Sequence, residues 1–437
     1  MKKLSTFFYS TQYLIILSAI ALIIWNFNLD IVGVPILLTM TFLFLVFNKD
    51  TMPSVPLIMN ALFMVSFTQW DFESVPLFIY MTPIALIGGM IIHIIRFKVS
   101  IFKGKMMLGI LLMVLATFLS TLNAVKVDFF YVFYISIGLL YALIYLFFRN
   151  TFDRDHIQYL YKMMSILGIL VSVQIILYYL KVDDFYYALE YKTINLGWGI
   201  SNYIATYLLM FLSITLYFVK TSSKKLVWLI VSLVEGTLIF FTASRGGMLT
   251  LLVMIPIYLF LLQYRDPNRK KYLVGFIVIF VSTVLFIFVF NDFIQVLFAR
   301  FRLMMLDDPG RLEMYREAID KFIANPLFGG GLFARVADKD YTMYHNTIFH
   351  VMATFGSVGL IALGIQIYQQ FKITLDRFKY QNIFLALALL AAHIHGMVDN
   401  VYLMPQFMVL MMIIVSVVEV ARDRSSDKAI VINQKIS

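Results

Sequence analysis

The chain has 437 residues, of which 61% are hydrophobic and only 14% are charged. This composition excludes a water-soluble globular domain, in which about one quarter of the residues are charged. The formal charge of +10 could suggest a nucleic-acid partner, but most basic residues fall in alternate loops between apolar segments, so we expect no nucleic acid. Without cysteine, the chain has no disulfide and no thiolate metal ligand.

The apolar segments predict an all-α polytopic membrane protein with about 14 transmembrane helices. They are about 17 to 23 residues long, enough to cross a hydrocarbon core of about 30 Å, and they lack the alternation of barrel strands. The first resembles a signal peptide, but it continues past Ala19-Ile20-Ala21, so we expect an uncleaved span. Pro53 and Pro56 make the third span the least secure. The spans are expected near 7–25, 31–47, 52–68, 75–95, 106–124, 128–148, 158–180, 200–219, 226–242, 248–264, 272–290, 345–367, 380–397 and 406–420.

Charge alternation predicts the orientation of these spans. One set of alternate loops holds most of the lysines and arginines, and by the positive-inside rule this set is cytoplasmic. The short loops of the other set hold only Lys126, Lys181, Lys192 and Arg245. We therefore expect a multi-pass protein of the inner (cytoplasmic) membrane with both termini in the cytoplasm. Residues 1–437 would form a single membrane domain with one large extracytoplasmic loop, 291–344.

Arg245 is the first candidate site residue. It lies in the segment Thr242-Ala243-Ser244-Arg245-Gly246-Gly247, a very tight turn between two spans at the depth of the outer lipid headgroups. A guanidinium binds phosphate oxygens through two parallel hydrogen bonds, and the two glycines let a bulky anion approach the backbone. A lipid diphosphate would fit this turn. Alternatively, Arg245 reaches ordinary headgroup phosphates.

The large loop contains a predicted amphipathic helix near 309–324, on or near the outer leaflet. Pro309 suits its first position, Asp308 can cap it, and Asn325-Pro326 ends it. Arg311 and Arg316 fall on the two edges of its apolar stripe, where arginines are common on interfacial helices. Arg311 also opposes the helix dipole in the first turn, a conflict that a bound anion would relieve. The stripe consists of Leu312, Tyr315, Ile319, Phe322 and Ile323.

Tyr344-His345-Asn346 ends the loop where the span 345–367 begins. Histidine is the usual general base near neutral pH, and the Asn346 amide can orient the His345 ring. A lone histidine is more often structural, so this reading depends on the neighbouring candidates. The upstream run Phe328-Gly329-Gly330-Gly331-Leu332 either brings N–H groups to a ligand or serves as a simple connector.

Other polar residues have both a functional and a structural interpretation. Asp399, outside the membrane after His395-Gly396, could hold a cation or an acceptor sugar. The acidic pairs Asp183-Asp184 and Asp307-Asp308 could bind a divalent metal, or could be a solvated loop and a helix cap. Five ionisable residues within spans are functional candidates that interhelical hydrogen bonds would also explain: Glu235, His93, His350, His393 and His395.

Three short motifs, strongest over residues 240–365, resemble the O-antigen ligase and polymerase superfamily in order and spacing. They are Ser244-Arg245-Gly246, Gly310-Arg311 followed by Asn325-Pro326-Leu327-Phe328-Gly329, and His345-Asn346 at the start of a span. Upstream, Ser201-Asn202-Tyr203 is similar to the family's asparagine at the head of a span. The chain departs from the pattern at Ser201, where proline is usual, and at Tyr315, where tryptophan is more frequent.

The resemblance implies a glycosyltransferase-C-like membrane fold and a metal-independent, inverting glycosyltransferase without a cofactor. Arg245 and Arg311 would bind the diphosphate of an undecaprenyl-diphosphate-linked oligosaccharide, and His345 would serve the acceptor hydroxyl. Arg316, Asn346, Asn202 and Asp399 are possible supporting residues. The favoured function is a polysaccharide polymerase working with a flippase and a chain-length regulator; the alternatives are a ligase-type transferase to a lipid or protein acceptor and a lipid-linked oligosaccharide flippase.

Overall fold

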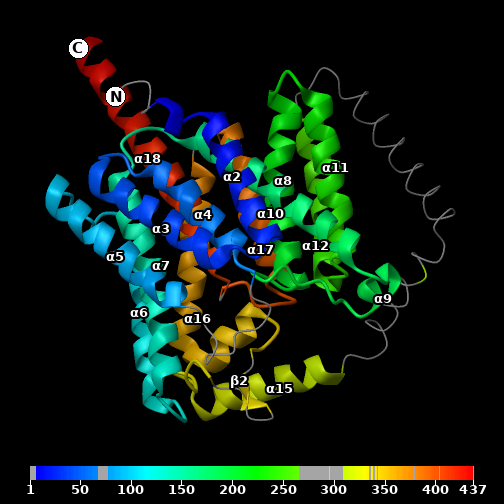
Figure 1. The fold of residues 1–437 in the computed structure, drawn as a ribbon. Coiled ribbons are helices and arrows are strands. Elements are labelled where there is room, and N and C mark those ends of the chain that lie inside the picture. Colours follow the sequence, from blue (N-terminus) through cyan, green and yellow to red (C-terminus); the bar gives the residue numbers. More distant parts are fainter. Residues whose placement is uncertain are drawn as a thin grey trace.

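The computed structural model describes residues 6–66, 77–264, 295, 309–333, 336, 337, 340, 341, 343–376, 379–402 and 404–436. In this part of the chain the architecture is a bundle of helices (Figure 1), with one short antiparallel pair formed by β1 (Val336–Ala337) and β2 (Asp340–Tyr341). The helices are α2 (Thr11–Asn26), α3 (Asp30–Phe47), η1 (Met52–Ser54), α4 (Val55–Met64), α5 (Leu77–Phe97), α6 (Met107–Ser120), η2 (Thr121–Asn123), α7 (Phe129–Thr151), α8 (Ile157–Lys181), α9 (Phe185–Glu190), α10 (Ser201–Thr221), α11 (Lys225–Phe241), α12 (Arg245–Gln263), α15 (Pro309–Ala324), α16 (Thr347–Thr374), α17 (Tyr380–His395) and α18 (Pro405–Ile436).

The described helices confirm an all-α polytopic membrane protein. Eight of them are long and apolar enough to cross a bilayer, and further apolar helices are shorter. Thirteen of the predicted spans overlap a described helix, whereas the span predicted at 272–290 lies outside the described residues. The third predicted span, 52–68, is covered only over Met52–Met64 by η1 and α4.

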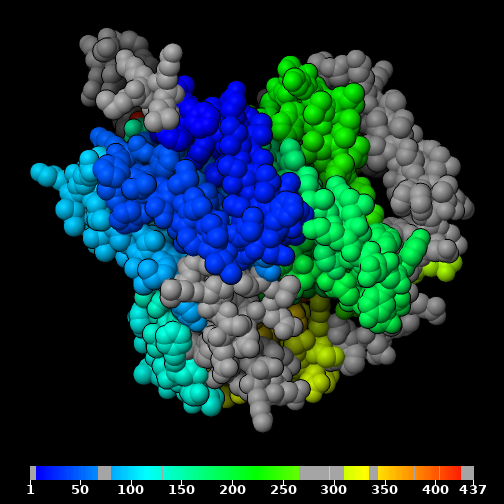
Figure 2. Space-filling view, in the orientation of Figure 1, coloured from blue at the N-terminus to red at the C-terminus, as the bar shows by residue number. Residues whose placement is uncertain are grey.

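The centre of the bundle is formed by α10 and α18. In the most apolar stretch of each helix, 83% of the residues of α10 and 89% of those of α18 are buried. The corresponding share is 22% in α5, which lies at the periphery. Four helices, α8, α11, α12 and α17, pack around α10. Figure 2 shows one outer face, where the first helices form the middle of the surface between α5 to α7 and the segments around α8 to α12. A central α10 fixes the position of the residues at its first turn.

The amphipathic helix α15 lies at one end of the bundle, which we call the α15 end; α2 begins and α18 ends at the opposite end (Figure 1). It packs against α16, with the Tyr315 ring stacked on Phe349 at 4.5 Å between centroids and Ala318 fully buried. In contrast, Leu312 and Ile323 of the predicted apolar stripe are 62% and 69% exposed. The helix therefore carries apolar side chains on a face that α16 does not cover.

The glycine run after α15 packs against a kink in α16. Gly329 and Gly356 both have positive φ values, 68° and 63°, which favour glycine. A Cβ atom on Gly329 would lie 2.4 Å from the Thr354 carbonyl carbon, so no side chain fits there. The N–H groups of Gly330 and Gly331 donate to carbonyl groups of α16, at Ala353 and at Thr354. These two amides serve the connection to α16 and do not point to a ligand.

Candidate functional site

At the α15 end, the first turns of α10, α12 and α16 meet the last turn of α17. Ser244 caps α12 by accepting a hydrogen bond from the Gly247 N–H at 3.2 Å. Asn346 caps α16 by accepting from the N–H groups of the two residues that follow Thr347, at 2.8 and 3.1 Å. The N–H of Thr347 in turn donates to the Gly396 carbonyl, which joins α16 to the end of α17. The N-termini of α12 and α16 are thus capped by Ser244 and Asn346, and both lie next to the end of α17.

Asn202 is the hub of a buried polar network at this place. Its amide Nδ2 donates to the Asp399 carboxylate, and its Oδ1 accepts from Lys192 Nζ at 2.6 Å and from Ser244 Oγ at 2.8 Å. The Asn202 and Asp399 side chains are both buried. Because buried polar groups are costly when unpaired, each contact helps to fix the others. The network joins α10, the start of α12 and the α17–α18 connection.

Asp399 also holds His345. The Nδ1 atom of His345 lies 3.1 Å from Asp399 Oδ1, which accepts a second hydrogen bond from the Asn400 N–H at 2.7 Å. A carboxylate partner means that Nδ1 carries the proton, so Nε2 is the ring nitrogen that can accept one. Burial would raise the pKa of Asp399, but the hydrogen bond and charge of His345, with His395 and the Asn400 amide, lower that pKa below its ordinary value. The Asp399 carboxylate is therefore ionised at neutral pH.

A second histidine, His395, lies beneath this network. Its Nδ1 is 2.7 Å from Thr206 Oγ1, and its ring is fully enclosed. A Cβ atom on Gly246 would lie 3.1 Å from His395 Nε2 and 2.4 Å from a methyl carbon of Val398. Gly246 therefore lets the start of α12 pack directly on the end of α17. The sequence predicted that a bulky anion approaches the backbone at these glycines. In the structure the groups that approach Gly246 are protein side chains, those of Val398 and His395.

The three candidate arginines differ in their positions. Arg245 is the first residue of α12, half-buried, and directly precedes Gly246. Arg311 is half-buried in the first turn of α15 and lies close enough to His395 for an electrostatic interaction. Arg316 is exposed. The edge of α15 that carries Arg311 therefore faces the network, whereas the edge that carries Arg316 does not.

Three residues of the network were not predicted as site residues: Lys192, Thr206 and His395. Lys192 was one of the four cations in the cation-poor loops, a signal that the sequence analysis used only for orientation. It has a positive φ of 57°, and its charge also reaches His395. His395 was considered only as one polar residue among several within spans. Nothing in the spacing of Thr206 and His395, 189 residues apart, indicates that they meet.

Most other polar residues within spans have structural partners. Glu235 accepts from Thr215 Oγ1 at 2.6 Å, His93 Nδ1 lies 2.6 Å from the Leu45 carbonyl, and His393 Nε2 lies 2.7 Å from Gln370 Oε1. His350 differs, because neither of its ring nitrogens has a hydrogen-bond partner in the described part of the chain. None of the four contacts the network around Asn202 and Asp399 in the hydrogen bonds described above.

The acidic pairs give no metal centre among the described residues. Asp184 caps α9 through a 2.9 Å hydrogen bond from the Tyr187 N–H, while Asp307-Asp308 lies outside the described residues. The geometry of Asp184 thus favours a structural role over a metal ligand.

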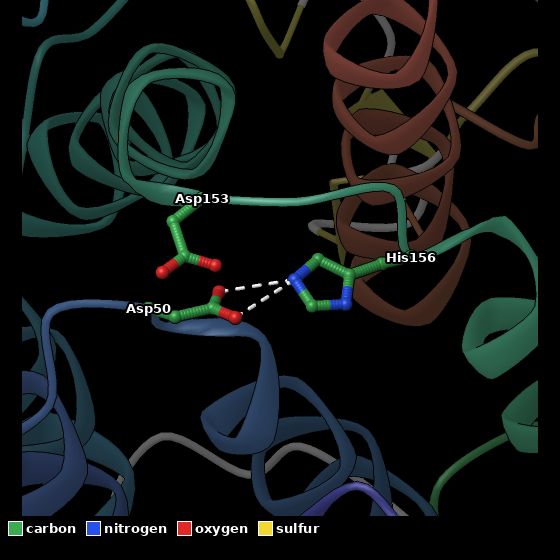
Figure 3. A group of neighbouring side chains, drawn as sticks. All are labelled: Asp50, Asp153 and His156. Carbon is green, nitrogen blue, oxygen red and sulfur yellow. Dashed lines mark hydrogen bonds and ion pairs between the residues drawn. The ribbon is translucent and has the colours of Figure 1, made fainter. Parts of the chain in front are cut away.

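The described carboxylates and histidines contain one group with metal-ligand spacing, at the end of the bundle opposite α15. Asp50, Asp153 and His156 place their ligand atoms within 4.8 Å of one another (Figure 3). Asp50 is already bonded to His156 Nε2 at 2.9 Å, to Tyr9 Oη at 2.7 Å and to Arg154 Nε at 3.2 Å. Burial would raise the pKa of Asp50, but the hydrogen bond and charge of His156, with the hydrogen bonds of Asp153 and Tyr9, lower that pKa. These contacts link the end of α3 to the connection between α7 and α8.

The comparisons with known proteins identify one domain. Residues 226–364 match the family model described as O-antigen ligase. The matched segment contains Arg245, Arg311 and His345. The match confirms the resemblance to the O-antigen ligase and polymerase superfamily that the motifs predicted. No curated protein matches the chain.

Proposed function

Because residues 226–364 carry the O-antigen ligase domain, we propose that the chain is a polysaccharide polymerase. It transfers a growing glycan from undecaprenyl diphosphate to the non-reducing end of another lipid-linked repeat unit, in the synthesis of a capsule, an exopolysaccharide or an O antigen. The observation that best supports this proposal is the hydrogen bond between His345 and the buried, ionised Asp399, next to two arginines at helix N-termini.

In this proposal the donor diphosphate is bound by Arg245 and Arg311. Both belong to the first turn of a helix, where N–H groups point outward and the helix dipole favours an anion. Each guanidinium can bind two phosphate oxygens at once. The two positive charges neutralise the charge that develops on the leaving diphosphate, which is the task a magnesium ion performs in other transferases. We therefore expect a metal-independent reaction.

The acceptor hydroxyl is activated by His345. With Nδ1 held by Asp399, Nε2 takes the proton as the hydroxyl oxygen attacks the anomeric carbon from the face opposite the diphosphate. The bond between the anomeric carbon and the diphosphate oxygen breaks, its electron pair leaves with the diphosphate, and the configuration is inverted. Tyr315 donates to the His345 carbonyl at 3.1 Å and so helps to fix the loop that carries the base.

The proposed location is the cell membrane, with the N- and C-termini in the cytoplasm and the α15 end outside. The support is the concentration of lysine and arginine in the loops at the other end of the bundle. A donor flipped to the outer leaflet would then reach the site, and a flippase and a chain-length regulator are the expected partners.

Two alternatives lead to different reactions. A ligase would transfer the same glycan to a lipid or protein acceptor, and the family match does not distinguish the two acceptors. A flippase would line a cavity near the middle of the membrane with polar side chains. The described network lies at one end of the bundle, and Glu235 and His393 within the bundle are bonded to neighbouring helices. These positions favour an enzyme.

The test is reconstitution of the purified protein with undecaprenyl-diphosphate-linked repeat units. Release of undecaprenyl diphosphate together with a lengthening glycan is the expected result. Translocation of the lipid with its sugar bond intact would support the flippase and sink the proposal. Transfer only after a core lipid or a protein acceptor is added would identify a ligase.

A further inference from the structure

An apolar groove runs along the side of the bundle between α8 and α11, which contact each other and stand side by side in Figure 1. Its volume is about 540 Å³. The lining includes Ile176 and Leu180 of α8 and Leu233 and Val234 of α11, and it ends at Phe241. No charged side chain lines it. The groove is therefore suited to a hydrocarbon chain.

The groove leads to the candidate diphosphate site. Phe241, the last residue of α11, packs against a small buried cluster that includes Ala243 and Met248 of the following turn and helix. Ala243 has a positive φ of 51°, so the chain turns sharply before it enters α12 at Arg245. Arg245 is thus only four residues from the end of the groove. Four residues of chain span at most about 14 Å, so Arg245 lies close to this end of the apolar groove.

We propose that this groove holds the first isoprene units of the polyprenyl tail while the diphosphate lies at Arg245. This inference rests on the proposed function and names the part of the chain that receives the donor lipid. An amphiphile with an anionic head and a hydrocarbon tail matches an apolar groove that has a cation, Arg245, close to one end. The exposed groove residues, such as Leu233 and Val234, are open to the side of the bundle, so a lipid enters without passing through the protein.

The groove contributes only a modest part of the affinity for the donor. A bilayer is as apolar as the groove, so moving the tail from lipid to protein gains packing and little hydrophobic free energy. Filling the groove should therefore raise the KM for a long-tailed donor several-fold and leave kcat nearly unchanged. A donor whose tail is too short to occupy the groove should not be affected.

Two valines of α11 provide a matched pair for this test. Val234 lines the groove, whereas Val227, seven residues earlier on the same helix, does not line it and is 54% exposed. Steady-state kinetics with an undecaprenyl-linked donor and with a methyl-linked donor, which carries no isoprene unit, should show a several-fold higher KM for Val234→Trp with the long donor alone. Val227→Trp should match the wild type with both donors. Equal KM values for Val234→Trp and the wild type, or an equal rise with both donors, would overturn the inference.

Photocrosslinking tests the groove without any substitution and without turnover. Wild-type protein in nanodiscs is irradiated with an undecaprenyl diphosphate that carries a diazirine near its head. Label should appear in residues 176–185 and 230–241, and unlabelled undecaprenyl diphosphate should suppress it while phosphatidylglycerol does not. Label elsewhere, or equal suppression by phosphatidylglycerol, would overturn the inference. If the wild type releases undecaprenyl diphosphate but the groove is not labelled, the inference alone fails; if it releases none, the proposed function fails.

Discussion

Replacing Asp399 by asparagine removes one charge from the buried network while keeping the shape of the side chain. The substituted amide can offer its carbonyl oxygen to His345 only by turning its NH₂ group toward the donor NH₂ of Asn202. A hydrogen bond to a charged group contributes about 1.5 to 3 kcal/mol. If the transition state depends on the oriented His345, its loss lowers kcat by about 10- to 100-fold, since about 1.4 kcal/mol is tenfold in rate.

The assay for Asp399→Asn is the release of undecaprenyl diphosphate at saturating donor, with thermal unfolding measured in parallel. Asp184→Asn is the control, because Asp184 caps α9 outside the network, and it should keep wild-type kcat. The exchange Asn202→Asp with Asp399→Asn restores an amide–carboxylate pair but moves the charge away from His345, so it should regain thermal stability and not rate. Wild-type kcat in folded Asp399→Asn would refute the reasoning.

Three further predictions follow from the same geometry. Gly246→Val places a Cβ atom 2.4 Å from a methyl carbon of Val398, so overpacking should lower the free energy of unfolding by about 1 to 3 kcal/mol and remove most activity. In the control Gly236→Ala the new Cβ atom meets no atom within 4 Å, so thermal unfolding should show a much smaller loss. The lowered pKa of Asp399 means that its stabilising contribution is present above the ordinary carboxyl pKa of about 3.9 and is lost as pH falls through the folded pKa. The difference in melting temperature between the wild type and Asp399→Asn should thus be present at about pH 5 and shrink as the pH falls below about 4; a difference that stays the same in stronger acid would contradict the assignment. A chelator should leave glycan transfer unchanged, and a loss that magnesium restores would show that the reaction needs a metal.

Local signals in the sequence predicted the helices well. Apolar length and the positions of proline and glycine are properties of short segments, and α15 covers the same residues, Pro309–Ala324, over which the helix was expected. Within the described part of the third span, the helical residues end at Met64, the last residue of α4, before Val65 and Ser66. The glycine run 329–331 could not be interpreted from sequence, because its role depends on the carbonyl groups of the α16 kink.

The polar network could not be predicted, because its contacts join distant parts of the chain. Asn202 and Asp399 are 197 residues apart, and His345 and Asp399 are 54 apart. The residue types were visible, and Asn202 and Asp399 were candidates, but no spacing rule indicates that an asparagine at the head of α10 meets an aspartate after α17. Their meeting results from the packing of α17 against α10. That packing depends on apolar side chains along two whole helices.

The most direct test of the account is the release of undecaprenyl diphosphate from lipid-linked repeat units by four purified single variants. Arg245→Ala, Arg311→Ala and His345→Ala should each abolish release while the protein stays folded in the membrane. Arg316→Ala, which changes an exposed arginine on the other edge of α15, should keep activity close to that of the wild type. Full activity in the first three variants would contradict the proposed site.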